Sequence, residues 1–415
     1  MRKFTLLVFA FLMAELTACA AAQELYKLLP ADGAQADHFG NSIAISGNTV
    51  VVGAYRDDNN SEIDSGSVYV FENGIEVAKL TASDTAAGDL FGTKVAIDGD
   101  TIVVGAPNGS PSGSAYVFLR PASGWTSVSQ ENAKLLPSDA HAYKSFGCSV
   151  AVSGDTVVVG AKGDSDGSGA AYVFVKPSRG WPKNLPETTK LTASDANDSD
   201  YFGSDVAISS GTVIVGAQGN DDNGSFSGSA YIFESPRGWE YASHEIAKLT
   251  ASDANISDYF GLRVAIDHDT AVIGAYHKDN KGAAYIFVKP AAGWADTSLE
   301  NAKLTASGSD YFGYDVAISA DTVIIADPMN DGPGQAFLFI APPGGWADTS
   351  QANAVLIASD GVNYDSFAYS VGIDGDTVVI GSYNDDDNGA DSGSAYVFKL
   401  NDTAFLPSIT SYLLN

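Results

Sequence analysis

The sequence predicts an all-β fold, a seven-bladed β-propeller made of four-stranded antiparallel blades. Three observations predict it: one unit repeats along the chain, its segments have the composition of strands, and those segments are apolar on both faces. The repeat is marked by the dipeptide Phe-Gly, which returns every 52 to 58 residues. A period this regular indicates an array of one supersecondary unit. The dipeptide stands at Phe39-Gly40, Phe91-Gly92, Phe146-Gly147, Phe202-Gly203, Phe260-Gly261 and Phe312-Gly313, with a degenerate seventh copy at Phe367-Ala368.

Each repeat contains four short segments that are rich in β-branched and aromatic residues and are separated by Gly, Asn and Asp. In one copy these segments are 247–251, 263–266, 270–275 and 283–287. Runs of this kind, without a helical period of 3.6 residues, are typical of strands joined by turns. We therefore expect four antiparallel strands in every repeat.

The predicted strands do not alternate apolar with polar residues, as 157–161 and 171–174 show. A sheet with one face in water alternates, so both faces of these sheets must be covered, and no helix is expected to cover them. Four-stranded sheets that pack against one another around an axis form a propeller. A linear solenoid is the alternative, but it would need polar capping repeats, and neither terminal repeat has that character.

The two ends of the repeat array predict how the ring closes. The segment 26–29 resembles the fourth strand of a blade, yet no blade precedes it, and the last repeat ends at Phe398 without a fourth strand. We expect the N-terminal strand to become the outer strand of blade seven, which removes an exposed sheet edge. The propeller would then span 23–398, followed by a C-terminal tail over 399–415.

Residues 1–22 are expected to be an export signal. Arg2-Lys3 precede an apolar run over 4–14, which is too short to cross a bilayer as a helix. The next residues, Leu16–Cys19, look like the bacterial lipobox, in which Cys19 is lipidated; the alternative is ordinary cleavage after 20–22. Either way we expect an exported protein without a transmembrane helix. It would be an outer-membrane lipoprotein, a periplasmic protein, or a secreted or cell-surface protein.

The charge of the chain restricts its partners and indicates a functional face. The formal net charge is −29, which argues against nucleic acid or an anionic membrane as a partner. In a propeller, the loops after the second strand and the loops before Phe-Gly share one face, which we call the top face. These loops hold 28 Asp and Glu and five Lys and Arg, so the top face is the expected surface for function.

Apart from Cys19 the chain has one cysteine, Cys148, which we expect to be a small core residue. With only one cysteine left, the exported domain would have no internal disulfide.

Phe-Gly followed by Val-Ala-Ile and then Val-Val-Gly-Ala-Pro resembles the FG-GAP repeat of the integrin α-subunit propeller, and most closely that of bacterial secreted FG-GAP proteins. The resemblance covers roughly 25–398, and 105–107 is its one intact Gly-Ala-Pro. It implies that the repeated Phe and Gly are scaffold residues. Integrin propellers carry calcium in an Asp-x-Asp-x-Asp-Gly hairpin between the first two strands of several blades. The corresponding hairpins here, such as 98–100, are too short to surround Ca²⁺, so that family site is not carried over.

The top-face loops contain alternating carboxylates and amides, which are hard oxygen ligands suited to Ca²⁺. Two interpretations stay open, because Asp, Asn and Gly also form turns in which their side chains bond nearby backbone. The candidate Ca²⁺ ligands are Asp57, Asn59, Asp164, Asp166, Asp221, Asn223, Asp385 and Asp387.

All five tryptophans share one position, in the loop between the third and fourth strands on the opposite face. A row of exposed indoles there could bind carbohydrate or a peptide; the alternative is that each Trp packs over the end of its blade. The five are Trp125, Trp181, Trp239, Trp294 and Trp346.

The sequence contains no catalytic motif that would predict an enzyme. The five histidines occupy different repeat positions, and there is no nucleophile elbow, zinc-protease motif or phosphate loop. We expect a monomeric, non-catalytic binding or adhesion propeller that recognises a protein or carbohydrate ligand through its top-face loops, with Ca²⁺ as a stabilising ion. The alternatives are an extracellular lyase or hydrolase with carboxylates at the propeller axis, and a structural component of the cell envelope.

Overall fold

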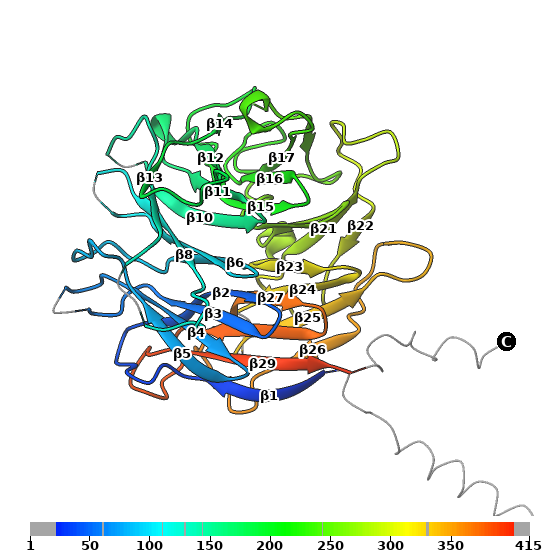
Figure 1. Ribbon diagram of the computed structural model, residues 1–415. Coiled ribbons are helices and arrows are strands. Elements are labelled where there is room, and N and C mark those ends of the chain that lie inside the picture. The colour runs from blue at the N-terminus through cyan, green and yellow to red at the C-terminus, as the bar shows by residue number, and fades with distance from the viewer. Residues whose placement is uncertain are drawn as a thin grey trace, which may run out of the picture.

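A computed structural model describes residues 22–401, except for 60–61, 110, 128–129, 143, 243 and 329–331. It confirms the predicted seven-bladed propeller: seven antiparallel sheets are arranged around one axis (Figure 1). Within each sheet the strands follow the order of the chain outward from the axis, except for the outer strand of blade seven.

The strands of each type have similar bounds from blade to blade. The innermost strands are β2 (Phe39–Ser46), β6 (Lys94–Asp98), β10 (Phe146–Ser153), β15 (Phe202–Ser209), β19 (Val264–Asp267), β23 (Val316–Ser319) and β27 (Phe367–Asp374). The second strands are β3 (Thr49–Ala54), β7 (Thr101–Ala106), β11 (Thr156–Ala161), β16 (Thr212–Ala217), β20 (Thr270–Ala275), β24 (Thr322–Asp327) and β28 (Thr377–Ser382). The third strands are β4 (Ser67–Glu72), β8 (Ser114–Leu119), β12 (Ala170–Val175), β17 (Ser229–Glu234), β21 (Ala283–Val288), β25 (Gln335–Ile340) and β29 (Ser394–Leu400). The outer strands are β5 (Ile75–Leu80), β9 (Ala133–Leu135), β14 (Thr189–Leu191), β18 (Ala247–Leu249), β22 (Ala302–Leu304), β26 (Ala354–Leu356) and β1 (Ala22–Leu28).

The core lies between the sheets, as the doubly apolar strands require. Each cluster of buried side chains combines residues from two neighbouring blades, and the second and third strands are almost wholly buried. Successive innermost strands contact one another around the axis, and β27 contacts β2. The apolar faces are therefore covered by adjacent blades, which is the arrangement that the sequence predicted.

The Phe-Gly dipeptide joins each blade to the preceding one. Phe39 is fully buried, and its ring lies edge-on to Tyr69 and Phe71 of its own blade while it packs against strands of blade seven. Its backbone forms a parallel bridge to Gly393, which precedes β29. Four other repeats form the same bridge between the Phe and the glycine before the third strand of the preceding blade. The scaffold role that the resemblance implied for Phe and Gly agrees with this packing.

The ring closes through the N-terminal strand, as expected. The strand β1 pairs antiparallel with β29, from Ala22 opposite Leu400 to Leu28 opposite Ala395, and the two lie side by side in Figure 1. Glu24 accepts hydrogen bonds from the backbone N–H and hydroxyl of Ser359, which ties β1 to blade six as well. Both ends of the array are thus held in one sheet.

Several details differ from the expected pattern. A fifth short strand, β13 (Asn184–Leu185), pairs in parallel with β9, and three single turns of 3₁₀ helix occur at η1 (Ser165–Gly167), η2 (Trp239–Tyr241) and η3 (Lys278–Asn280). The first described residue, Ala22, already belongs to β1, and the last strand ends at Leu400, two residues after the expected Phe398. The predicted signal up to residue 21, with Cys19, and the tail from residue 402 lie outside the described residues. Within the described part of the chain, no helix has the length and apolar character needed to cross a membrane.

Candidate functional site

Six of the seven blades contain the same polar group at the top face, which we call the tyrosine cluster. A tyrosine of the third strand lies opposite a lysine of the outer strand, and an aspartate from the loop before Phe-Gly contacts both. In blade one the Tyr69 hydroxyl oxygen lies 2.8 Å from both Asp32 and Asp57, which share its one proton, and Lys79 Nζ lies 2.8 Å from Asp32 and 2.6 Å from Asp57. The six cross-strand pairs are Tyr69–Lys79, Tyr116–Lys134, Tyr172–Lys190, Tyr231–Lys248, Tyr285–Lys303 and Tyr396–Lys27.

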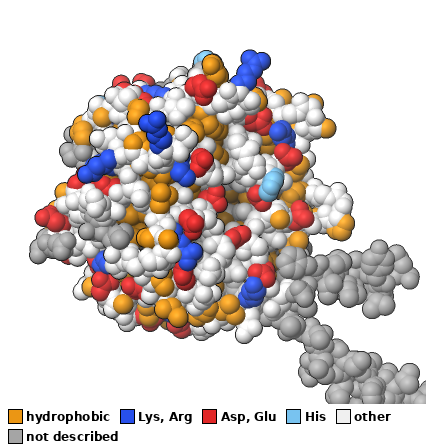
Figure 2. Space-filling view, viewed as in Figure 1, with side chains coloured by type: hydrophobic (Ala, Val, Ile, Leu, Met, Phe, Trp, Pro, Cys, Tyr) orange, Lys and Arg blue, Asp and Glu red, His pale blue; other side chains and the backbone are white. Residues whose placement is uncertain are grey.

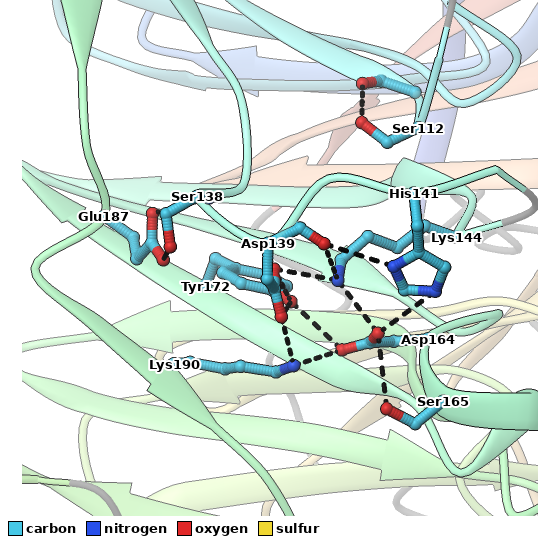
Figure 3. A network of polar contacts seen from close by, with 11 residues as sticks. Ser112, Ser138, Asp139, His141, Lys144, Asp164, Ser165, Tyr172, Glu187 and Lys190 are labelled. Carbon is cyan, nitrogen blue, oxygen red and sulfur yellow. Dashed lines mark hydrogen bonds and ion pairs between the residues drawn. The ribbon is translucent and has the colours of Figure 1, made fainter.

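Blade three has the most elaborate cluster, in which five side chains point toward one another (Figure 3). Lys190 Nζ lies 2.7 Å from Asp139 and 2.5 Å from Asp164, and the Tyr172 hydroxyl donates to the same two carboxylates. A second lysine, Lys144, is fully buried and lies 2.9 Å and 2.8 Å from these aspartates. Two lysines therefore balance two carboxylates, and this part of the top face carries little net charge.

Blade six shows that the cluster behaves as a unit, because it lacks all three of its members. Phe337 stands where the other blades have tyrosine, Val355 where they have lysine, and Gly308 where they have aspartate. A phenyl ring needs no hydrogen-bond partner, so this blade can omit the aspartate and the lysine together without leaving a polar group unpaired.

The charges of the cluster stabilise one another. Burial raises the pKa of the Asp32 carboxyl, but the hydrogen bonds from Lys79 and Tyr69 outweigh burial and hold that pKa below its ordinary value. Burial alone would lower the pKa of Lys79, yet its hydrogen bonds to Asp32 and Asp57 raise it. Both groups stay charged at neutral pH. The tyrosine hydroxyl stays protonated, since burial and the neighbouring carboxylates raise the pKa of Tyr69 far above its usual range.

The structure places the eight candidate Ca²⁺ ligands in two kinds of environment. Asp57, Asp164 and Asp385 are buried members of tyrosine clusters, and Asn59 is buried among Ser65, Gly66 and Ser67. The remaining four, Asp166, Asp221, Asn223 and Asp387, are exposed. Of these, Asp387 pairs with Lys27, and Asp221 accepts a hydrogen bond from the Phe226 N–H. Among the described residues, no group of three or more His, Cys, Asp or Glu is arranged to hold a metal ion. Calcium binding by these loops stays a prediction.

Replacing Lys79 by methionine is expected to lower the free energy of unfolding by about 2–4 kcal/mol, because it leaves the buried Asp57 carboxylate without a cation. The matched control is Lys176→Met, which breaks a pair with the exposed Asp155 and should cost less than about 1 kcal/mol. Urea unfolding of both variants measures the difference.

The same comparison has a defined pH dependence. The lowered pKa of Asp32 stabilises the fold above pH about 4, where this carboxyl is ionised in the unfolded chain as well. The raised pKa of Lys79 stabilises the fold below pH about 10, where this lysine is charged in the unfolded chain as well. The deficit of the Lys79→Met variant should therefore shrink as the pH falls through 4. Equal costs for the two lysine variants, or a deficit that is unchanged at pH 3, would contradict a stabilising role of the cluster.

The tryptophans of the opposite face mainly pack against their blades. Trp125, Trp239 and Trp294 are 6–8% exposed and belong to core clusters, and Trp181 and Trp346 pack against such clusters while staying half-buried. These contacts favour packing over the alternative of a carbohydrate or peptide platform.

The second feature of the top face is a cavity of about 440 Å³ at the propeller axis, which we call the axial mouth. Its lining comes from the residues just before and after Phe-Gly and just after Gly-Ala. Cys148 lines it too and is half-buried, so the expectation of a core cysteine was wrong. The lining residues are Asn41, Tyr55, Leu90, Thr93, Lys94, Pro107, Asn108, Ser145, Cys148, Lys162, Ser204, Arg263 and Tyr369.

An arc of aromatic rings continues from this lining around the blades five, six, seven and one. Neighbouring ring centroids lie 4.1–6.0 Å apart, and most of the rings are half-buried. The members of this aromatic arc are Tyr259, Tyr276, His277, Tyr311, Tyr314, Tyr369, Tyr383, His38 and Tyr55.

Sequence reasoning predicted a site on the top face but did not predict these residues. It counted loop carboxylates as free charge, whereas the outer-strand lysines reach them, and Figure 2 shows Lys and Arg interspersed with Asp and Glu over the face in view. The signal that could have found the tyrosine cluster is the joint loss of its three members in repeat six. The signal for the axial mouth is the run of aromatic residues directly beside Phe-Gly at Tyr259, Tyr311, Tyr314 and Tyr369.

The comparison with protein families agrees with the repeat architecture. A family model described as FG-GAP repeat matches seven segments, 23–71, 75–118, 129–174, 186–233, 244–287, 299–339 and 351–398. Among solved structures 429 chains match, and one of them is the crystal structure of the computationally designed Ika8 protein. That protein is 17% identical to this chain, with 91% of this chain and 99% of that chain covered and a TM-score of 0.49. No curated protein matches the sequence.

Proposed function

Because the chain belongs to the FG-GAP repeat family, we propose that it is a non-catalytic propeller that binds a protein or a glycan through its top face, outside the cytoplasm. The axial mouth is the observation that carries this proposal. It is a concave site to which several blades contribute half-buried aromatic and polar side chains. In the tyrosine clusters, by contrast, the lysine, tyrosine and aspartate side chains are already paired with one another. Concave sites of this composition are the usual binding sites of globular proteins.

The test compares the full chain with variants of its two faces. Labelled protein is applied to a glycan array and to intact cells, alongside Tyr55→Ala in the axial mouth and Lys176→Gln on the opposite face. We expect specific binding that Tyr55→Ala weakens and Lys176→Gln leaves unchanged. Binding that responds only to the change at Lys176 would place the functional surface on the other side and refute the proposal.

The enzyme alternative, with carboxylates at the axis, has candidates in Asp205, on the innermost strand β15, and Asp315, directly before the innermost strand β23. Both are almost buried, and each accepts a hydrogen bond from a backbone N–H, of Val264 and of Val371 respectively, at 2.9 Å. These contacts support a structural role, and neither residue lines the cavity. Turnover of polysaccharides or phosphoesters that is abolished by Asp205→Asn or Asp315→Asn in a folded variant would establish the enzyme instead.

Ca²⁺ enters the proposal as a stabilising ion of the top-face loops. At Asp57, Asp164 and Asp385 the ion would compete with lysine Nζ atoms that already lie within 3 Å of the carboxylates. Calorimetric titration of chelator-treated protein with Ca²⁺ tests this part. Absence of both heat and a shift in melting temperature would remove calcium from the proposal.

Export and lipidation rest on the sequence before residue 22. Cell fractionation, together with labelling by a radioactive fatty acid, tests both in the full-length precursor. We expect the label in the unchanged chain and its loss in Cys19→Ala; an exported protein that never carries the label would indicate simple secretion, and retention in the cytoplasm would contradict export.

A further inference from the structure

The axial mouth has two chemically different halves. The aromatic arc supplies one half, with Tyr55 and Tyr369 reaching the cavity, and the Tyr314 ring continues the arc 5.1 Å from Tyr369. The opposite half comes from blades two to four and is polar. Among its lining residues are Thr93, Lys94, Asn108, Lys162 and Ser204.

Cations are concentrated in this cavity although the protein as a whole carries −29. Lys94, Lys162 and Arg263 all line it. The outer-strand lysines are all committed to carboxylates, whereas within the described residues Lys94 and Lys162 form no ion pair. Two lysines of the axial mouth are therefore free to bind a ligand.

Arg263 is only partly neutralised. Its side chain is 15% exposed, Nη1 donates to the Leu262 carbonyl, and Nε lies 3.4 Å from Asp315 Oδ1 without forming a hydrogen bond to any described residue. The acids that face these cations are Asp205 and Asp315, each of which is also bonded to a backbone N–H. Three cations, Lys94, Lys162 and Arg263, therefore stand against two carboxylates, Asp205 and Asp315. The cavity keeps a positive balance.

We propose that the axial mouth binds an acidic saccharide, one that carries a uronate carboxylate on a sugar ring. The inference rests on the proposed function and gives its ligand a chemical class. Lys94 and Lys162 supply charge-assisted hydrogen bonds to the carboxylate, and the parts of the Tyr55 and Tyr369 rings that line the cavity supply apolar surface for the C–H groups of the sugar. The cavity of about 440 Å³ is within the range of roughly 300–1,000 Å³ that small-molecule sites occupy.

The charges favour this ligand over two others. A cationic peptide side chain would suit the aromatic arc, but three cations already line the cavity and would repel it. A neutral glycan would leave Lys94 and Lys162 unpaired once water is displaced, which lowers affinity.

The experiment is calorimetric titration of the full chain with oligogalacturonate and with the matching neutral oligogalactoside. We expect the acidic sugar to bind at least about tenfold more tightly, since hydrogen bonds to a charged group are the strong ones. The double variant Lys94→Gln, Lys162→Gln should lose that preference. Its matched control is Lys281→Gln, which removes an exposed top-face lysine outside the cavity and should bind as the unchanged chain does.

The aromatic half is tested with Tyr369→Ala, or with Tyr55→Ala if the first variant does not fold, and either change should weaken both sugars about tenfold. Equal affinity for acidic and neutral sugars, or equal competition by inorganic sulfate, overturns the acidic saccharide. If no sugar binds but a protein ligand is lost on Tyr55→Ala, the inference fails and the proposed binding function stands. If no ligand responds to any change in the axial mouth, both fail.

Discussion

Replacing Gly393 by alanine is expected to lower the free energy of unfolding by about 3 kcal/mol or more, since several mechanisms of large destabilisation act at this one position. Gly393 has φ of +86°, a conformation that costs an L-residue energy, and an added Cβ would lie 2.0 Å from the Phe39 carbonyl oxygen. The Phe39 oxygen belongs to the backbone, and the position of the Cβ is fixed by the backbone of residue 393, so no flexible side chain can move away. The clash would separate blade seven from blade one where their backbones bridge.

Gly375→Ala is the matched control for this prediction. Gly375 lies in the same blade with φ of +57°, and nothing stands within 4 Å of its added Cβ. It should cost about 1–2 kcal/mol, the price of a left-handed residue alone. Urea unfolding of both variants measures the two effects; similar losses would show that the close approach of Phe39 and Gly393 contributes nothing beyond the backbone angle.

Deleting residues 22–28 should have the other large effect, a loss of cooperative unfolding together with association of the chains. The deletion removes β1, including Leu28, which is 1% exposed, and Lys27, whose Nζ contacts three carboxylates of blades six and seven. It also leaves β29 as an unpaired edge, and such edges template pairing with other chains. Thermal melting and light scattering measure the two consequences.

A peptide added in trans makes this test specific. A synthetic peptide of residues 22–31 should restore a single melting transition and suppress association, whereas the same peptide with Leu28→Asp should not, because a charge would enter the core of blade seven. Full cooperativity of the truncated chain without any peptide would mean that the ring does not depend on β1.

Much of the fold could be predicted because repetition multiplies weak signals. A single run such as 157–161 does not distinguish a strand from a buried helix segment, but seven equivalent runs at one period do. The solitary strand at 26–29 predicted ring closure for the same reason. The extra strand β13 could not be foreseen, since it arises from the path of one loop rather than from the repeated pattern.

The site was less predictable because its contacts depend on geometry across strands. The lysines were assigned to the outer strands, but a lysine side chain is long enough to reach carboxylates at the blade edge, as Lys79 reaches Asp57. Likewise, Lys94 and Arg263 follow Phe-Gly at the same offset in different repeats. They meet at the axis only because the innermost strands form a ring.

Pairing residue 22 with residue 400 also has a consequence for engineering and topology. Each segment matched by the family model begins with the outer strand of one blade and continues with the three inner strands of the next blade. The sequence repeat is therefore shifted by one strand relative to the blade. The ring consequently has no intrinsic starting point, and a circular permutant that joins the present ends and opens at another blade would keep every interblade contact. Any cargo fused at either end would be tethered to the same outer edge.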